Sequence, residues 1–376
     1  MNSIISFFTG AGFLDLGFEH AGFRIDMVNE YAPEFLEGYM HSRELLGSPK
    51  PRYGHHLGSI EEFSSGAHLA TLRAVVNDIR RSGRKVGFVG GPPCPDFSIG
   101  GKNAGSEGDH GRLTAIYFAL IRELKPDFFV FENVEGLWRT KVHRQFYDEQ
   151  KAIVSDVDYV LHDRLTSAVA YGVGQDRKRI FLVGVLNGCE DLEFPFEETM
   201  THSEDVLDLD WPTTKPFEQG DNLAFPDGSG LPKELTVQHW FEQNDVENHP
   251  NGQMWFNPQS DKFHSVPEGD VKKKSFKRLH RWRYSPTAAY GNNEVHLHPF
   301  EPRRISVAEA LAIQSLPADY QLPEDMSLSA CFKTIGNGVP YLAAVGLGTS
   351  LRKHLIAEDM AVLERQSPQS TRLAAE

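Results

Sequence analysis

Short apolar runs separated by segments with helical spacing occupy the first half of the chain. Residues 4–8, 86–89, 128–131 and 180–184 are runs that predict buried strands. Between two of them, residues 113–124 carry apolar side chains at the spacing of an amphipathic helix, and Pro126 follows as a helix breaker. Because strands that alternate with helices build parallel sheets, we expect residues 1–185 to form an α/β domain with a doubly wound, mostly parallel sheet.

The pattern changes after residue 185. Up to about residue 300 the chain is rich in Pro, Asn, Asp, Gly and aromatic residues and shows little periodicity, which predicts a second, smaller domain over residues 186–318. Ser306 and Glu309 have the spacing of a capping box, so a helix should begin there and brace this domain. Residues 319–357 should return to the first domain and end in a helix over about 340–355. The polar tail at 358–376 is expected to be frayed.

A glycine-rich turn, Thr9–Gly12, separates the first predicted strand from the helical spacing of residues 13–18. Missing Cβ atoms let a ligand approach such a turn closely. Glu30 follows about 20 positions on, where a carboxylate can accept hydrogen bonds from ribose hydroxyls. The third glycine of the dinucleotide fingerprint is absent, since position 15 is Asp15 and Gly17 comes later. A cofactor without a pyrophosphate relaxes that requirement, which points away from NAD and towards S-adenosylmethionine.

A second loop, residues 90–98, presents Cys94 directly after a predicted strand. Prolines at 92, 93 and 95 fix three φ angles and remove three backbone donors, so the loop continues neither as a helix nor as a central strand. A thiol held at the carboxyl end of a strand lies where α/β proteins place their reaction chemistry. Taken alone, a single cysteine would favour a buried structural role.

The order of these motifs resembles the DNA (cytosine-5) methyltransferase family, of the bacterial or phage type. The resemblance runs from about Phe7 to about Leu351, apart from a divergent centre. Its segments are residues 8–12, 92–94, 131–134, 175–181, 303–317 and 335–340. It implies the S-adenosylmethionine-dependent methyltransferase fold, with the central region as a target-recognition domain. It also implies methyl transfer to carbon 5 of a flipped-out cytosine in a specific duplex sequence, because attack on the ring is blocked while the base is stacked.

The chemistry of that reaction explains the residue types. A thiolate from Cys94 that adds to carbon 6 makes carbon 5 nucleophilic enough to attack a methyl sulfonium. Addition builds negative charge at N3 and O2, which Glu132, at the end of an apolar strand, can stabilise by sharing a proton. Arg177 and Arg179 alternate before an apolar run and should share one face, where their guanidinium groups suit a base oxygen and flanking phosphates. The resemblance implies that Arg179 contacts the cytosine.

The resemblance also assigns the cofactor residues. They line the methionine, ribose and adenine sides of one pocket: Phe8, Gly10, Gly12, Glu30, Tyr31, Ser59, Ile60, Pro92, Asn337 and Val339. Ser59 stands where the family usually has an acid that recognises the adenine amino group, so it accepts a hydrogen bond without a charge. Pro95 and Phe13 replace a common glutamine and a common glycine, and neither change removes a reacting group.

Double-stranded DNA is the expected partner although the net charge is −14. Phosphates respond to local fields within about 10 Å, and residues 271–283 are a local basic run without an acidic residue. The predicted DNA contacts are Ser98, Lys102, Lys272, Lys273, Lys274, Lys277, Arg278, Arg281 and Arg283. A solvated basic segment is the alternative for this run. The glycine-dense, polar residues 99–112, directly after the cysteine loop, are expected to form a mobile lid.

Composition excludes several other classes of protein. No apolar run reaches 18 residues, which argues against a membrane span, and Met1–Ser3 lacks a basic signal region. Three cysteines without CxxC spacing argue against disulfides, export and structural zinc. Sixteen histidines include no helical pair with an acidic third ligand, so we predict no metal site. We therefore expect a cytoplasmic, monomeric enzyme, with a cognate restriction endonuclease as a possible companion.

Two alternatives use parts of the same pattern. An RNA cytosine-5 methyltransferase would share the motifs, but its relatives have a small recognition region, whereas the one predicted here is large and rich in aromatic residues. A nucleotide-binding oxidoreductase or an inactive DNA-binding regulator would not need Cys94, Glu132 and Arg179 together, and the glycine fingerprint is incomplete.

Overall fold

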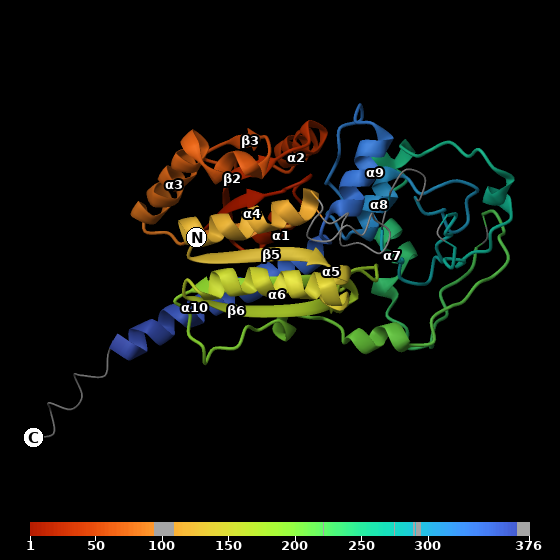
Figure 1. Ribbon diagram of the computed structural model, residues 1–376. Coiled ribbons are helices and arrows are strands. Elements are labelled where there is room, and N and C mark those ends of the chain that lie inside the picture. Colours follow the sequence, from red (N-terminus) through yellow and green to blue (C-terminus); the bar gives the residue numbers. More distant parts are fainter. Residues whose placement is uncertain (94–108, 221, 274, 289, 291–294, 367–376) are drawn as a thin grey trace, which may run out of the picture.

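The computed structural model describes residues 1–93, 109–220, 222–273, 275–288, 290 and 295–366 (Figure 1). Cys94, Ser98, Lys102 and Lys274 therefore lie outside the described residues, as does most of the predicted lid. The first lobe is built on a seven-stranded sheet with the order β3-β2-β1-β4-β5-β7-β6. Its strands are β1 (Ser3–Phe7), β2 (Arg24–Glu30), β3 (His55–Leu57), β4 (Val86–Gly90), β5 (Phe128–Val134), β6 (Tyr159–Ser167) and β7 (Lys178–Leu186).

Strand direction confirms the predicted doubly wound, mostly parallel sheet. β1 is parallel to β2 and β4, β2 to β3, and β4 to β5. The exception is β7, which is antiparallel to both of its neighbours, β5 and β6. A short connection joins β6 to β7, and so short a link suits an antiparallel pair because a parallel crossover needs a dozen or more residues.

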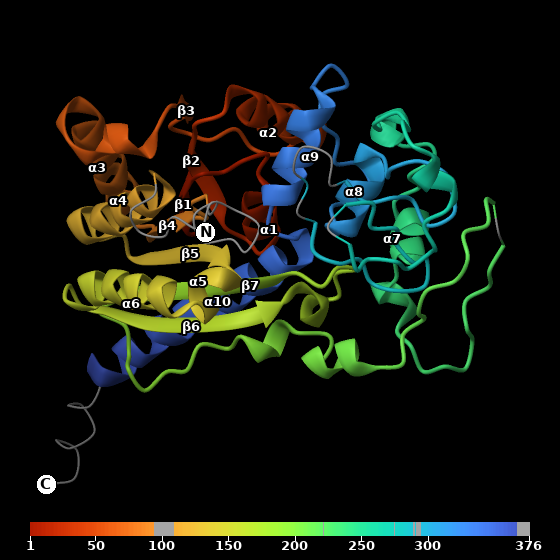
Figure 2. The ribbon, with the colours of Figure 1, turned by 45° about the vertical axis from the view of Figure 1, so that its right-hand side comes forward.

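Helices cover both faces of the sheet, which explains why the central strands β1, β4 and β5 are almost entirely buried. Phe129 and Phe131 of β5 pack on one face, which α3, α4 and α6 cover, whereas Phe128 and Val130 pack on the other with α1, α2 and α10. α10 runs along the face opposite α6 (Figures 1 and 2). The helices of this lobe are α1 (Phe13–His20), α2 (Pro33–Leu45), α3 (Gly66–Arg81), α4 (Asp109–Leu124), α5 (Glu135–Arg139), α6 (Lys141–Ser155) and α10 (Tyr341–Gln366).

The second lobe lies beyond the carboxyl ends of the parallel strands (Figure 2). Over the described part of residues 187–306, one α-helix, α7 (Val237–Gln243), is joined by 3-10 turns and isolated bridges. α8 (Val307–Ile313) and α9 (Leu328–Asn337) pack with α7 in a second core. Ser306 and Glu309 form the predicted capping box at the start of α8. Ala11 and Phe13, from the glycine turn, belong to this second core and join the two lobes.

The domain boundaries stay predictions, but two segments differ from what their composition indicated. Phe194 and Phe196, beyond the predicted boundary at 186, still pack in the first-lobe core with α10. The frayed tail predicted from 358 is wrong up to Gln366, because α10 continues to that residue. Both carboxylate oxygens of the buried Glu358 accept a hydrogen bond from the Cys189 amide, at 3.0 and 2.9 Å, which fixes this part of the helix.

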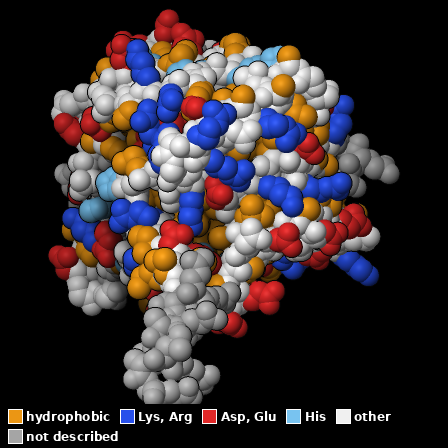
Figure 3. Space-filling model, turned by 90° about the vertical axis from the view of Figure 1, so that its left-hand side faces the viewer, with side chains coloured by type: hydrophobic (Ala, Val, Ile, Leu, Met, Phe, Trp, Pro, Cys, Tyr) orange, Lys and Arg blue, Asp and Glu red, His pale blue; other side chains and the backbone are white. Residues whose placement is uncertain are grey.

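The surface of the first lobe carries mixed charges, and its described helices are not of the membrane-spanning kind. No helix among the described residues is long and apolar enough to cross a membrane. The end of the first lobe shows Lys and Arg side chains intermixed with Asp and Glu (Figure 3). Although the net charge is −14, this face therefore carries both positive and negative side chains.

Candidate active site

The predicted catalytic residues come from strand ends that meet at one edge of the sheet. β4 ends at Gly90 and β5 ends at Val134, and both run parallel towards the second lobe (Figure 1). β7 begins at the same edge because it is antiparallel to β5, so that Val134 lies opposite Arg179. This edge is where open α/β sheets place ligands.

Glu132 and Arg179 form a buried ion pair at this edge. Glu132 lies opposite Phe181 on β7, and Arg179 is two residues away on the same side of that strand. Diagonal neighbours of this kind are within reach of long side chains. The Nε atom of Arg179 lies 2.8 Å from Oε1 of Glu132, and the two side chains are only 12 % and 9 % exposed. The predicted pair of an acid and an arginine is thus assembled before any substrate arrives.

The environment of Glu132 shifts the pKa of its carboxyl group upwards. Burial raises the pKa of Glu132 above its usual value, while the positive charges of Arg179 and Arg177 lower it and limit the rise. Such a carboxyl can share a proton with a ring nitrogen near neutral pH more readily than an exposed glutamate can. Neighbouring Asn133 accepts a hydrogen bond from the Val134 amide at 2.8 Å, as expected for a residue that organises the loop backbone.

The loop that leads to Cys94 passes directly beside this pair. A Cβ atom on Gly91 would lie 2.7 Å from Oε2 of Glu132, so only glycine fits without displacing the carboxylate. Sequence reasoning did not single out Gly91. The other two cysteines, Cys189 and Cys331, are buried, and burial raises the pKa of the Cys331 thiol to about 12. A thiolate at Cys331 is therefore disfavoured.

Arg177 does not lie where the sequence predicted. It was expected to face the base and the phosphates beside Arg179, but it is fully buried between the two lobes. Its Nη1 donates to the Ala288 carbonyl at 2.9 Å and its Nη2 donates to the Gly336 carbonyl at 2.7 Å. Arg177 precedes the first residue of β7, so the alternation of a strand does not extend to it. Its guanidinium joins the lobes, and its charge acts on Glu132 through space.

The glycine turn has an unusual backbone that suits the close approach of a ligand. Phe8, Gly10 and Gly12 have φ values of 55°, 55° and 84°, in the left-handed region. A Cβ atom on Gly12 would lie 2.5 Å from the Tyr39 ring, so this position needs glycine on two grounds. Phe8 is a non-glycine residue in that region, a form of strain that is concentrated at functional sites.

Asp15, which interrupts the dinucleotide fingerprint, stabilises this turn. Its buried carboxylate accepts hydrogen bonds from the Ser6 and Thr9 hydroxyls at 2.6 and 2.7 Å. Burial raises the pKa of Asp15, against the lowering effect of Arg43. The sequence analysis noted only that Asp15 was not glycine. The feature of the sequence that could have revealed this role is a polar residue on the apolar face of a short helix.

Glu30 and Tyr31, both predicted to bind the cofactor, lie beside the glycine turn at the end of β2. One oxygen of Glu30 accepts from the Gly10 amide at 2.7 Å, and the other accepts from the amides of Tyr31 and Ala32, each at 2.9 Å. The carboxylate is thereby fixed against the glycine turn, and the oxygen that accepts from Gly10 retains a lone pair for a further donor. The Tyr31 ring is 75 % exposed and is open to stacking.

The remaining predicted cofactor residues differ in burial and in the hydrogen bonds of their side chains. Ser59 caps a 3-10 turn, η1 (Ile60–Ser64), and its hydroxyl accepts from the Glu61 amide at 3.2 Å. Ile60 is buried in the first-lobe core, and its side chain does not face solvent. Pro92 and Val339 are also buried, whereas Asn337 is exposed at the end of α9. The serine in place of the usual acid thus has a structural role in capping η1.

The basic run at 271–283 divides into exposed and buried parts. Lys272 and Lys273 are exposed, and Lys277 and Arg283 are half-buried. Arg278 and Arg281, also predicted to contact DNA, are buried, and this prediction is corrected.

Arg278 donates to four backbone carbonyls, which are those of Phe263, Val266, His298 and Glu301. Arg281 forms two hydrogen bonds with the Glu268 carboxylate, at 2.9 and 3.0 Å. These two arginines stabilise a lobe that has little regular secondary structure. Arg278 donates to backbone carbonyls that no helix or strand pairs, and Arg281 donates to a buried carboxylate.

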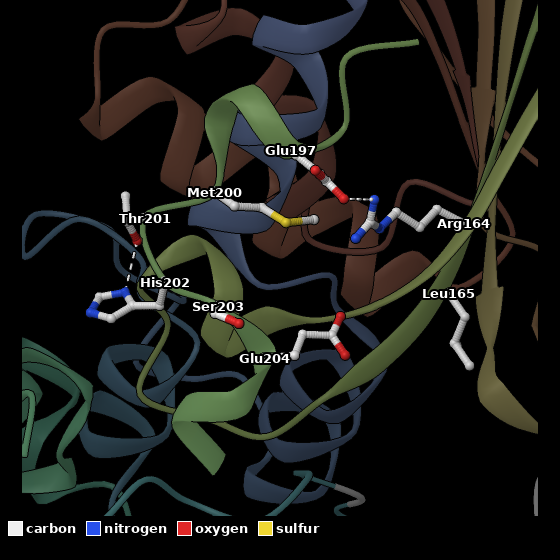
Figure 4. A pocket seen from close by; sticks show the side chains of 8 residues that line it. All are labelled: Arg164, Leu165, Glu197, Met200, Thr201, His202, Ser203 and Glu204. Atoms are coloured by element: carbon white, nitrogen blue, oxygen red, sulfur yellow. Dashed lines mark hydrogen bonds and ion pairs between the residues drawn. The ribbon is translucent and has the colours of Figure 1, made fainter. Parts of the chain in front are cut away.

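A separate open pocket of about 590 Å³ lies between β6 and the 3-10 turns that follow the sheet (Figure 4). Arg164 pairs with Glu197 at 2.9 Å, and Glu204 accepts from the Ser167 amide at 3.1 Å. None of the predicted catalytic or cofactor residues lines this pocket. Its charged groups are occupied by each other and by the backbone, so we assign the reaction to the strand edge instead.

The seven-stranded sheet, with β7 antiparallel beside β5 and helices on both faces, has the fold of S-adenosylmethionine-dependent methyltransferases. Over residues 2–353 the sequence matches the family described as C-5 cytosine-specific DNA methylase. The chain belongs to that family, and the function that the sequence predicted, methylation of cytosine at carbon 5 in DNA, is confirmed.

Named relatives agree with this assignment. The chain is 53 % identical to the Type II methyltransferase M.NmeDI of Neisseria meningitidis serogroup C, over 94 % of this chain and 84 % of that protein. It is 28 % identical to the Type II methyltransferase M.MthTI of Methanothermobacter thermautotrophicus, over 94 % and 97 %.

Among solved structures, a putative DNA modification methyltransferase from an E. coli prophage has a TM-score of 0.60 at 20 % identity and covers 95 % of this chain and 100 % of its own. DNMT2 of Spodoptera frugiperda has a TM-score of 0.56 at 16 % identity, over 95 % and 100 %. At these identities the likeness supports the fold alone.

Proposed function

We propose that Cys94 is the nucleophile of this cytosine-5 methyltransferase and that Glu132 and Arg179 stabilise the charge that its attack creates. The observation that carries the proposal is the buried Glu132–Arg179 pair, with Gly91 in contact range of the carboxylate. Cys94 follows Gly91 by three residues, and a chain of that length spans at most about 10 Å. The high pKa of Cys331 supports Cys94 over that alternative thiol.

In the proposed mechanism, the thiolate of Cys94 forms a bond to carbon 6 and the ring electrons move towards N3 and O2. Glu132 shares its proton with N3, and the Arg179 guanidinium pairs with the oxygen. Carbon 5 then takes the methyl group from the sulfonium as the methyl–sulfur bond breaks, and a neutral thioether is left. Loss of the carbon 5 proton to a base expels the thiolate and restores the aromatic ring, while Glu132 recovers its proton. Arg177 takes no part in contact with the base.

We propose S-adenosylmethionine as the methyl donor, and the residues present fit it. Glu30 is fixed against the glycine turn, where its free lone pair can accept from a ribose hydroxyl. The exposed Tyr31 ring can stack on the adenine, and the glycine turn leaves room beside the backbone. When bound, the cofactor supplies an electrophilic methyl group on a sulfonium. Pro92, Asn337 and Val339 remain proposed contributors, and Ser59 and Ile60 are proposed to contribute through their backbone.

For the partner, we propose that duplex DNA lies between the lobes, with the target cytosine extruded towards the strand edge. Lys272, Lys273, Lys277 and Arg283 are proposed phosphate contacts, together with Ser98, Lys102 and Lys274 from outside the described residues. We also propose a cytoplasmic monomer. The relative at 53 % identity is named a Type II methyltransferase, which supports a companion restriction endonuclease.

Bisulfite sequencing of DNA from a host that expresses the chain tests the assigned roles. The unaltered protein should protect cytosines in one sequence context. Glu132→Gln keeps the shape of the side chain but cannot return a proton, so the rate on purified DNA should fall by roughly two to four decades. Glu135→Gln, three residues away at the start of α5, is the matched control and should stay near normal. Near-normal turnover of Glu132→Gln would contradict the role.

A further inference from the structure

Three side chains that could bind a metal ion converge outside the reaction site, on His56, Glu62 and His68. Nε2 of His56 lies 3.0 Å from Oε2 of Glu62, and Nε2 of His68 lies 4.0 Å from the same oxygen. The three potential ligand atoms lie within 4.8 Å of one another. Among the described residues, no other group of three His, Cys, Asp or Glu side chains has its ligand atoms this close together.

The fold brings these residues together within 13 positions of the sequence. His56 lies on β3, an edge strand, Glu62 lies on the 3-10 turn η1, and His68 lies in the first turn of α3. The chain reverses between them. No helical pair of histidines is involved, which is why the spacing of histidines along the sequence did not predict a site here.

Two contacts hold the three side chains in this arrangement. The Oε1 atom of Glu62 accepts from the Ser59 amide at 3.1 Å, as part of the capping box of η1, so Oε2 is left to face both imidazoles. The buried Phe63 ring lies 4.7 Å from the His56 ring and 6.0 Å from the His68 ring, measured between centroids. Groups that orient a ligand in this way are what metal sites use to fix their geometry.

The donor set identifies the kind of ion. Two imidazoles and one carboxylate suit zinc and other first-row transition metals, whereas Mg²⁺ and Ca²⁺ prefer oxygen ligands. With metal–ligand bonds of about 2.0 to 2.1 Å, ligand atoms in a tetrahedral site lie about 3.3 Å apart. The His56–Glu62 distance of 3.0 Å is close to this value. His68 lies 4.0 Å from Glu62 and within 4.8 Å of both ligand atoms, so its imidazole must move closer to bind the same ion.

We propose that His56, Glu62 and His68 form a surface site for a divalent transition-metal ion of the zinc type, with water completing the coordination. The side chains are 21 %, 43 % and 50 % exposed, so an ion and its water have access from solvent. The site is separate from Glu132 and Arg179 and does not depend on the proposed mechanism.

Calorimetric titration of the full, chelator-treated chain with Zn²⁺ tests the proposal. The unaltered protein should bind one equivalent more tightly than any other. His68→Ala should weaken that equivalent by tenfold or more, since even the loss of an orienting group costs about that much. Glu62→Gln should do the same while its amide oxygen keeps the capping bond to Ser59.

His264→Ala is the matched control, because His264 is an exposed histidine outside the cluster and should leave the titration unchanged. Mg²⁺ should not compete for the site. The absence of a tight equivalent would mean that His56 and Glu62 are a hydrogen-bonded pair only, and would overturn the proposal. A tight equivalent that survives both His68→Ala and Glu62→Gln would place the zinc elsewhere and overturn it as well.

Discussion

At the scale of single residues, the site depends on how one carboxyl group is surrounded. Burial favours the neutral form of Glu132, and two arginines favour the charged form. Arg179 lies in direct contact at 2.8 Å, whereas Arg177 acts from between the lobes. The opposing effects keep the pKa of Glu132 raised but limited, which suits a group that both gives and recovers a proton in one turnover.

This balance predicts a pH effect. Arg179→Ala removes a positive charge that lowers the pKa of Glu132, so that pKa should rise further. Because the proton on Glu132 is needed, the limb of the rate profile that falls at alkaline pH should move to higher pH. The residual rate should also fall by roughly two to four decades, the usual contribution of such groups. Single-turnover rates across a pH series, with enzyme in excess over DNA, measure both effects.

The matched control is Arg139→Ala, an exposed arginine that pairs with Glu135 on α5. It should leave both the rate and the limb unchanged. An alkaline limb that stays in place in Arg179→Ala, or moves to lower pH, would contradict the account of Glu132.

At the scale of elements, the apolar runs predicted β1, β4, β5 and β7, whereas the more polar strands β2, β3 and β6 were not predicted. The run at 128–131 became β5, and the capping box at Ser306 became the start of α8, because local pattern and packing agree there. The antiparallel direction of β7 was not foreseen, since an apolar run carries no information about direction. α10 extends past its predicted end because Glu358 bonds to a residue 169 positions earlier, a contact that no local pattern reveals.

The same limit explains the two buried arginines of the basic run. A sequence of Lys and Arg residues looks uniform, but Arg278 and Arg281 meet carbonyls and a carboxylate from distant positions. Arginine is better suited than lysine to such buried, forked hydrogen bonding. Lys272 and Lys273 remain exposed in the same segment.

This division predicts a difference in stability. Arg281→Ala leaves the buried Glu268 carboxylate without its bidentate partner and should reduce the free energy of unfolding by about 3 to 5 kcal/mol. Lys272→Ala should change it by less than about 0.5 kcal/mol, as expected for an exposed position. Denaturant unfolding of the two variants provides the comparison. Equal stability of both would mean that Arg281 is not part of the structural support of the lobe.

At the scale of the whole molecule, a protein of net charge −14 must bind a polyanion through a limited surface. Exposed Lys272 and Lys273 should contribute contacts to phosphates, which add affinity without base information. Removing both as Lys272→Ala/Lys273→Ala should reduce the slope of log K against log salt by about two units, just under one for each contact. The effect should be equal for target and non-target duplexes.

Binding to both duplexes across a salt series measures this slope. Lys353→Ala is the control, because Lys353 pairs with Glu198 on the first lobe. A slope that does not change in the double variant would place the phosphate surface elsewhere. A loss confined to the target duplex would instead make these two lysines readers of base sequence.

The most direct test of the account is covalent trapping at Cys94. DNA with 5-fluorocytosine at the target should become attached to the protein in the presence of the methyl donor, because fluorine cannot leave as the proton does in the last step. Peptide mapping should find the adduct on Cys94. It should persist in Cys189→Ser and Cys331→Ser, whose cysteines are buried, and vanish in Cys94→Ser. Absence of an adduct under conditions that support methylation, or an adduct that survives in Cys94→Ser, would contradict the proposed mechanism.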